Sequence, residues 1–161
     1  MSFWSGNIRH LGLRETDTGQ YAGVREVDYV TACAVLASAA AIRAVGPMDE
    51  SYYMYNEDTD WCTRARGAGY AVIVAPESKI WHKVSMSSGG GLTPFKIYNR
   101  LRSTRRFFSL HARPYHWLGI VPLTVLRTVS FAVGELVGGR AGNVGAILRG
   151  LRDSATGRRR N

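Results

Sequence analysis

One polar stretch near the middle of the chain constrains the fold more than any other feature. Residues 53–70 read YMYNEDTDWCTRARGAGY, which places three carboxylates within four positions, at Glu57, Asp58 and Asp60. Carboxylates are favoured at the positive N-terminal end of a helix, so the pattern predicts a helix over residues 58–66. Asp60 and Arg64 are four residues apart, a spacing that favours a surface ion pair.

Apolar side chains in the same stretch follow the helical repeat. Trp61, Ala65 and Ala68 stand at positions i, i+4 and i+7, which predicts that they form the buried face of this helix. From this pattern alone, a well-capped surface helix explains the carboxylates, because structural carboxylates far outnumber catalytic ones. The segments on both sides of the stretch point to chemistry instead.

Three motifs occur in a fixed order around the polar stretch. They are VDYVTA at residues 27–32, VGPMDESYYMYNEDTDWCTRARGAGY at residues 45–70 and APESKIWHKVS at residues 75–85. Together they resemble the acceptor-side half of the family 2, GT-A type inverting glycosyltransferases. Within that family the chain is most similar to the bacterial rhamnosyltransferase-like members, which build cell-envelope glycans. The segment FWSGNIRHLG at residues 3–12 also resembles the family.

The resemblance implies a fold and an activity. The implied fold is α/β, a partial GT-A (Rossmann-like) mixed sheet followed by C-terminal amphipathic helices. The implied reaction transfers a sugar, with rhamnose as one candidate, from a nucleotide-diphosphate sugar donor to a cell-envelope glycan or a lipid-linked acceptor, with inversion. The family's donor-binding half has no counterpart in this sequence, so we expect it to come from further chain or from a partner subunit, and this chain alone to be inactive without it.

The resemblance also assigns a catalytic base. An inverting transfer needs one group to take the proton of the acceptor hydroxyl as that hydroxyl attacks the anomeric carbon. Asp58 matches the second residue of the family's ED motif and is the expected base. Glu57 and Asp60 are then expected to position the acceptor or to tune Asp58, because neighbouring carboxylates raise the pKa of one another. Structural roles for Glu57 and Asp60 stay open.

Other site residues follow from the same resemblance. The expected substrate-binding residues are Thr31, Ala32, Trp61, Arg64 and Arg100. The family usually has glycine where this chain has Ala32, and its order around residues 98–100 differs from YNR, so both assignments depart from the pattern.

A metal ligand is expected beyond residue 75. Pro76, Glu77 and His82 keep the family's P-E-x-x-x-x-H spacing, which implies that His82 binds a metal or the diphosphate. The cofactor would be a divalent cation, Mn2+ or Mg2+. Neutral imidazole suits manganese, whereas magnesium prefers oxygen ligands. A packing role for a lone histidine beside Trp81 is the alternative.

Elsewhere, composition and periodicity predict ordinary elements. We expect a buried strand over residues 27–36, a helix over 37–45, a strand over 70–75, a flexible loop over 85–93 and a helix from residue 94. The two cysteines, Cys33 and Cys62, fit no zinc spacing and indicate a reducing compartment.

Charge divides the sequence into two parts. Residues 1–94 hold 8 basic and 10 acidic side chains, a net charge of −2, whereas residues 95–161 hold 13 basic and 2 acidic ones, a net charge of +11. A basic segment attracts polyanions such as anionic lipid, nucleic acid or nucleotide phosphates. No nucleic-acid recognition motif is visible, so nucleic acid is not the expected partner.

The last third has the pattern of a membrane-surface region. The apolar run at residues 117–126 is too short for a span, but apolar stripes at helical spacing follow it to residue 136 and recur over residues 144–151, next to arginines. We therefore divide the chain into an acceptor-side domain at 1–113 and a membrane-associated tail at 114–161, peripheral on the cytoplasmic face of the cell membrane. Packing of both stripes on the domain stays open.

A non-catalytic membrane- or partner-binding protein without a donor site is the alternative function.

Overall fold

The chain folds into two compact units, each built from separate stretches of sequence. A computed structural model describes residues 1–13, 15–82 and 91–156. The helical unit comprises residues 1–8, 53–55 and 84–161, and the mixed unit comprises residues 9–52 and 56–83. The predicted loop at 85–93 and the arginines at 158–160 lie mostly or wholly outside the described residues.

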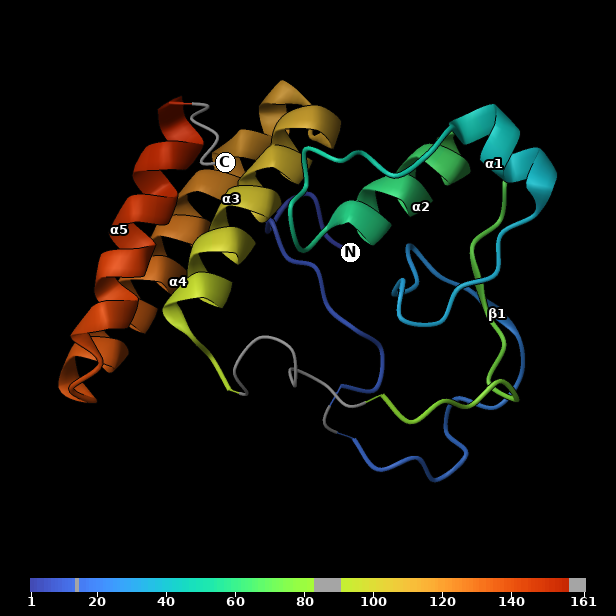
Figure 1. Ribbon diagram of the computed structural model, residues 1–161, viewed down its shortest axis with the longest axis horizontal. Helices are drawn as coiled ribbons and strands as arrows, with labels where there is room; N and C mark the ends of the chain where they lie inside the picture. The colour runs from blue at the N-terminus through green and yellow to red at the C-terminus, as the bar shows by residue number, and fades with distance from the viewer. Residues whose placement is uncertain (14, 83–90, 157–161) are drawn as a thin grey trace. The chain divides into compact units, whose positions relative to one another are not determined.

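Three long helices build the helical unit. They are α3 (Pro94–His111), α4 (Trp117–Val137) and α5 (Ala141–Thr156), with the short 3-10 helix η2 (Pro114–His116) between the first two. The three helices run side by side, with α4 antiparallel to α3 and α5 (Figure 1), and α5 packs against both of the others. The Thr93 hydroxyl caps α3 by accepting a hydrogen bond of 3.3 Å from the Lys96 N–H. Pro94 occupies the first turn, where its missing N–H costs nothing.

Apolar packing between these helices forms the core of the unit. Ile97, Ala146 and Ile147 are buried together, and Phe131 and Ala132 of α4 pack against them. A second cluster surrounds the fully buried rings of Phe107 and Phe108. The N-terminal segment joins this cluster, because the ring of Phe3 contacts both of these rings and that of His116.

A glycine allows the N-terminal segment to pack closely on α4. A Cβ atom added at Gly119 would lie 2.2 Å from the Trp4 carbonyl oxygen, far inside contact distance. Arg127 of α4 also donates a hydrogen bond of 2.6 Å to the Ser5 carbonyl. The aromatic-glycine segment is therefore a packing element of the helical unit.

The mixed unit contains two helices and a minimal sheet. Helix α1 (Ala39–Val45) is capped by the Ser38 hydroxyl, and α2 (Glu57–Gly67) carries the carboxylates of the polar stretch. Strands β1 (Arg25–Glu26) and β2 (Ile73–Val74) pair antiparallel, with Arg25 opposite Val74 and Glu26 opposite Ile73. The chain is thus a helix-rich mixture of helix and strand, and the predicted GT-A sheet is not seen in these two short strands.

The predicted strand over residues 27–36 is wrong. The Val27 N–H extends the sheet by one hydrogen bond to the Val72 carbonyl, at 2.8 Å, and the following residues are irregular. Val35 and Leu36 are 44% and 99% exposed, so the apolar run is not buried. A strand needs a neighbour for its backbone groups, and within the described residues the segment finds none beyond β2.

Helix α4 is longer than the apolar run that the sequence analysis singled out. Together with η2 it forms a 24-residue helical segment, Pro114–Val137, that is long and apolar enough to cross a membrane by length and composition. The described residues hold one such segment, and little of it is buried inside the protein. The expectation that this region is too short to span a membrane is therefore wrong as regards its length.

Candidate functional site

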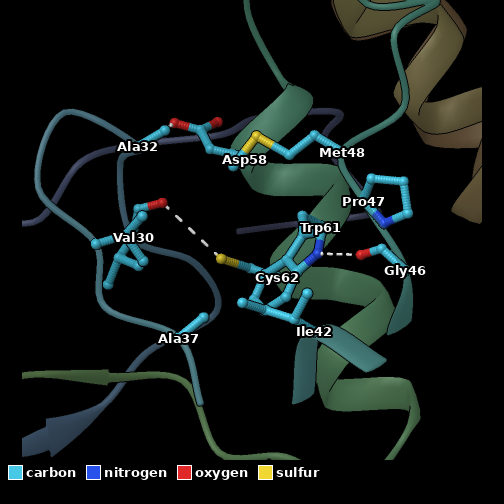
Figure 2. Close-up of a pocket in the computed structure, with 11 residues that line it drawn as sticks. Val30, Ala32, Ala37, Ile42, Gly46, Pro47, Met48, Asp58, Trp61 and Cys62 are labelled. Atoms are coloured by element: carbon cyan, nitrogen blue, oxygen red, sulfur yellow. Dashed lines mark hydrogen bonds between the residues drawn. The ribbon is translucent and has the colours of Figure 1, made fainter. Parts of the chain in front are cut away.

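A pocket opens beside the N-terminal half of α2 in the mixed unit. Its volume is about 320 Å3, and its walls come from the irregular segment at 30–37, from α1 and the turn that follows it, and from α2 (Figure 2). Most of its lining is apolar, including Val30, Ile42 and Met48. Asp58 is the one charged residue among the described residues that line it.

Hydrogen bonds fix the Asp58 carboxylate at this pocket. One carboxylate oxygen, Oδ2, accepts a bond of 3.1 Å from the Ala32 N–H, which is 26 residues away in the sequence. The other, Oδ1, accepts bonds from the Thr59 N–H at 2.7 Å and the Thr59 hydroxyl at 3.2 Å. A carboxylate oxygen has two lone pairs, so Oδ2, which accepts one bond, can still receive a hydroxyl from a molecule in the pocket.

Ala32 suits this arrangement, although the resemblance described above predicts glycine at this position. Ala32 is not among the residues with positive φ, so its methyl group causes no backbone strain. Its contribution to Asp58 is the backbone N–H, which any residue except proline would supply.

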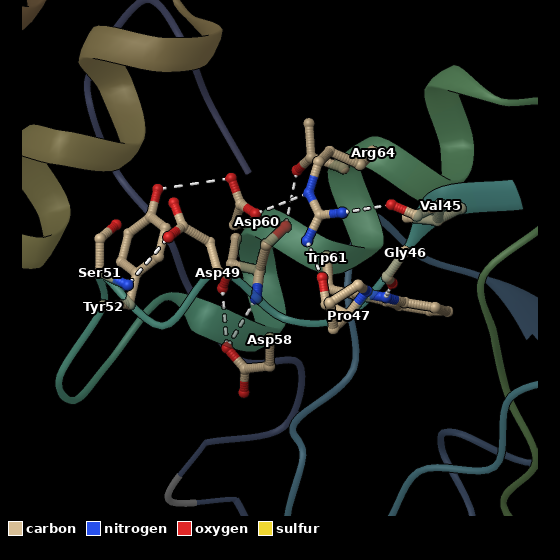
Figure 3. A network of polar contacts seen from close by, with 12 residues as sticks. Val45, Gly46, Pro47, Asp49, Ser51, Tyr52, Asp58, Asp60, Trp61 and Arg64 are labelled. Atoms are coloured by element: carbon tan, nitrogen blue, oxygen red, sulfur yellow. Dashed lines mark hydrogen bonds and ion pairs between the residues drawn. The ribbon is translucent and has the colours of Figure 1, made fainter. Parts of the chain in front are cut away.

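Asp60 belongs to a network that holds the turn after α1 against α2 (Figure 3). Its buried carboxylate accepts a hydrogen bond of 2.8 Å from Arg64 Nε and one of 3.4 Å from the Tyr52 hydroxyl. Arg64 in turn donates to the carbonyls of Val45 and Pro47, at 2.7 and 2.9 Å. The predicted ion pair is confirmed, but its carboxylate is buried rather than on the surface.

Trp61 lines the pocket and is anchored to the same turn. Its indole Nε1 donates a hydrogen bond of 2.8 Å to the Gly46 carbonyl. Gly46 follows α1 with φ 79°, a positive value that glycine adopts without strain. The buried face of α2 also differs from the prediction: Ala65 is buried as expected, but Ala68 is exposed and Cys62 is buried in its place.

Glu57 is half-buried at the first position of α2. One of its carboxylate oxygens is buried and has no hydrogen-bond partner within the described residues. Burial raises the pKa of Glu57, and the neighbouring Asp58 charge raises it further, against a backbone hydrogen bond that lowers it. The two residues before it, Tyr55 and Asn56, have φ of 70° and 67°, which is uncommon for any residue with a side chain. Strained backbone of this kind clusters at functional sites.

The other expected site residues do not join the pocket. The Thr31 hydroxyl contacts the Cys33 sulfur at 2.9 Å, and neither Thr31 nor Arg64 is part of the lining. Arg100 is an exposed residue of α3, in the helical unit.

The structure adds Cys62 to the pocket lining, and its buried thiol points to the Val30 carbonyl at 3.9 Å (Figure 2). Cys33 and Cys62 are both free, and burial raises the pKa of the Cys62 thiol.

The described residues do not by themselves form a metal site. His82 is exposed beyond β2, and no group of three or more histidine, cysteine, aspartate or glutamate side chains gathers anywhere in the described ranges. The donor set therefore does not fit a divalent cation on its own. We derive no chemical step through a metal, and the role of His82 stays a prediction.

Two comparisons with known proteins found no match, and a third found a partial one. No family model and no solved structure matches the chain. Over 65 residues it is 32% identical to the N-acetylglucosaminyl-diphospho-decaprenol L-rhamnosyltransferase of Mycobacterium tuberculosis, in strains CDC 1551 / Oshkosh and ATCC 25618 / H37Rv. The match covers 40% of this chain and 21% of the relative. The chain thus spans about a fifth of the length of these relatives, and the similarity indicates a distant glycosyltransferase-like relationship.

Proposed function

We propose that this chain is the acceptor-side part of a family 2, GT-A type inverting glycosyltransferase and that Asp58 is its general base. One observation carries the proposal: a carboxylate held by the Ala32 N–H stands at the edge of a largely apolar pocket. The pocket volume of about 320 Å3 lies within the usual range for small ligands, roughly 300–1,000 Å3.

The proposed step transfers one proton and exchanges one bond. An acceptor hydroxyl in the pocket donates a hydrogen bond to Asp58 and attacks the anomeric carbon of the donor sugar. Its proton passes to the Asp58 carboxylate as the new glycosidic bond forms, and the bond to the nucleotide diphosphate breaks on the opposite face, which inverts the configuration. The Ala32 and Thr59 hydrogen bonds keep the carboxylate oriented during the attack.

The lining and the partial relative together favour a particular acceptor class. Trp61, anchored by Gly46, offers an aromatic surface for the apolar face of a sugar ring. The relative's name specifies a sugar linked through a diphosphate to decaprenol. We therefore propose a lipid-linked sugar or a cell-envelope glycan as the acceptor, a nucleotide-diphosphate sugar such as a rhamnose donor, and a reaction at the cytoplasmic face of the cell membrane.

The donor site and the cation are separate parts of the proposal. A GT-A enzyme needs a nucleotide-binding part, which we expect from further chain or from a partner subunit. The resemblance implies a divalent cation, Mn2+ or Mg2+, and that nucleotide-binding part would have to supply most of its ligands. His82 is our candidate to contact the diphosphate or its cation, and a His82→Ala variant with a raised KM for the donor would support it.

The experiment compares three proteins isolated from the native source, so that any longer chain or partner is retained. Wild type, Asp58→Asn and Asp17→Asn are assayed with a radiolabelled nucleotide sugar, Mn2+ and lipid-linked acceptor. Asp17 is an exposed carboxylate of the same unit that pairs with Lys79, so it controls for the loss of a charge. We expect Asp58→Asn to lower kcat by at least about 100-fold, the contribution of a general base, and Asp17→Asn to retain activity.

Two results would overturn the assignment. Wild-type activity that survives in Asp58→Asn would exclude Asp58 as the base. Absence of transfer from the wild-type protein with every donor, in a preparation whose intact mass equals that of this chain, would favour the alternative of a non-catalytic membrane- or partner-binding protein.

A further inference from the structure

Helix α4 presents a continuous apolar face that the rest of the helical unit leaves open. On a helical wheel, Leu118, Val125, Val129 and Leu136 lie within about 40° of one another. Leu118 is 80% exposed, and the other three are each more than half exposed. Because Leu118 and Leu136 stand next to the two ends of α4, the face runs along nearly the whole helix.

The polar residues of α4 lie on its other side. Glu135 is buried and accepts hydrogen bonds from Arg140, at 2.7 Å, and from Asn143, at 2.6 Å. Arg127 is turned toward the N-terminal segment, where it donates to the Ser5 carbonyl. One side of the helix is thus satisfied within the unit, and the open side carries no charge.

Charge distinguishes between the candidate occupants of this face. Residues 84–161 contain 13 basic and 2 acidic side chains. Both acidic side chains are engaged within the unit, Glu135 with Arg140 and Asp153 with Arg152. An apolar face within so basic a segment matches an anionic lipid bilayer, which offers hydrocarbon and negative charge in one surface.

Aromatic side chains gather at one end of α4. Trp4 and Tyr115 lie beside the N-terminal end of α4, with ring centroids 5.7 Å apart, and are 60% and 45% exposed. The C-terminal ends of α3 and α5 lie at this end too (Figure 1), and the exposed Arg105 and Arg152 belong to the C-terminal halves of these two helices. Tryptophan, tyrosine and arginine are the residues that anchor proteins at the headgroup level.

The helices packed with α4 determine whether it can span the bilayer or must lie in its plane. By length and composition the segment Pro114–Val137 could span it. However, α5 packs against α4, and α3 packs against α5. A spanning α4 would draw their arginines, among them Arg102, Arg105 and Arg149, into the hydrocarbon, which is unfavourable for charged groups. With α4 lying in the plane of the membrane, its apolar face enters the lipid and the arginines stay at the headgroups or in water.

We infer that α4 is an in-plane anchor that attaches this protein to anionic membranes through the face formed by Leu118, Val125, Val129 and Leu136. The inference does not depend on the proposed transferase activity, because none of these residues belongs to the pocket or to its unit. It specifies which surface contacts the membrane, that the helix lies in the membrane plane, and that the lipid is anionic.

Vesicle flotation of the full chain tests the attachment. Vesicles contain phosphatidylcholine with or without phosphatidylglycerol, and the variant carries Val125→Asp and Val129→Asp. The matched control carries Leu11→Asp and Leu13→Asp, the same kind of change at exposed apolar residues of the mixed unit that lie outside the pocket lining. We expect wild type and control to bind the anionic vesicles and the α4 variant to bind at least about tenfold more weakly. Equal binding of all three would overturn the inference, as would failure of the wild type to bind.

Depth measurements separate an in-plane helix from a spanning one. Spin labels are placed at Leu118→Cys, Val129→Cys and Leu136→Cys in a Cys33→Ser background, because Cys33 is the exposed native thiol. An in-plane helix gives one shallow depth at all three positions, whereas a deep label at 129 between shallow ends would show a span and overturn the inference. If wild type instead self-associates without lipid and Val125→Asp/Val129→Asp abolishes this, the face is a protein interface and the inference is wrong.

Discussion

Each of the two units is stabilised internally by a different kind of interaction. In the helical unit, neighbouring helices joined by short connections bury a shared apolar core, with Phe107 and Phe108 fully inside. In the mixed unit, hydrogen bonds link residues far apart in the sequence, such as Asp58 to Ala32 and Trp61 to Gly46. The shape of the pocket therefore depends on a few specific hydrogen bonds, whereas the packing of the three helices depends on the apolar surface that they bury.

Removing a core ring gives the largest expected effect and tests the apolar side of this comparison. Phe107→Ala deletes a side chain that is fully buried and contacts the rings of Phe3, Phe108 and His111. We expect the free energy of unfolding of the helical unit to fall by about 3–5 kcal/mol, measured by urea denaturation followed by circular dichroism. Phe95→Ala, at a ring that is 45% exposed, is the control and should cost far less.

Removing the charged group of Arg64 tests whether hydrogen bonds stabilise the mixed unit. Arg64→Ala removes the ion-pair partner of the buried Asp60 carboxylate and frees the carbonyls of Val45 and Pro47. The Arg64 side chain is 30% exposed, so water can partly replace it, and the loss should be smaller than for a fully buried pair. We expect the free energy of unfolding to fall by about 1–3 kcal/mol, the cost of leaving a buried acceptor unsatisfied. Hydrogen exchange should become faster at residues 45–47 and in α2, with α3 to α5 unchanged.

A second arginine of the same helix is the matched control. Arg66 pairs with Asp28 at 3.0 Å, but both side chains are more than a third exposed. Exposed pairs contribute little, so Arg66→Ala should change the free energy of unfolding by less than about 1 kcal/mol. Equal losses in the two variants would mean that the turn after α1 is not held by the Asp60–Arg64 network.

The sequence predicted the helices well because their signals are local. Helix α2 was expected over residues 58–66 and spans Glu57–Gly67, and α3 begins at residue 94 as expected. Caps such as Ser38 and Thr93 act on backbone groups within three residues, so a single sequence contains the whole interaction. The same holds for the Asp60–Arg64 pair, four residues apart.

What the sequence missed depends on partners distant in the chain. The run at residues 27–36 has the composition of a buried strand, but its backbone lacks a neighbour beyond β2 within the described residues. Asp60 is buried because Tyr52 and Arg64 enclose its charge, which its position in a charged stretch does not reveal. Asp58 and Ala32 were each expected at the site from a family resemblance, whereas the hydrogen bond that joins them follows only from the fold.

The smallest expected effect concerns Glu57, one of whose carboxylate oxygens is buried without a hydrogen bond within the described residues. It tests whether every polar group of the mixed unit stabilises it. Burial raises the pKa of Glu57 above its ordinary value of 4.5, so above the raised pKa the folded state carries a charge that it disfavours. Glu57→Gln should therefore stabilise the unit at neutral pH, by less than about 1 kcal/mol. The gain should shrink as pH falls through the folded-state pKa and vanish below the ordinary value, where both side chains are neutral.

Asp17 provides a control of opposite sign in the same unit. The Gly19 N–H and Lys79 lower the pKa of Asp17, so its charge stabilises the folded state above the ordinary aspartate pKa, and this contribution is lost as pH falls through the lowered value. Thermal unfolding from pH 3 to pH 8 should show Asp17→Asn below wild type and Glu57→Gln above it at neutral pH, with the differences narrowing in acid. A destabilised Glu57→Gln at neutral pH would mean that the attraction between this carboxylate and the N-terminal end of α2 exceeds the cost of its burial.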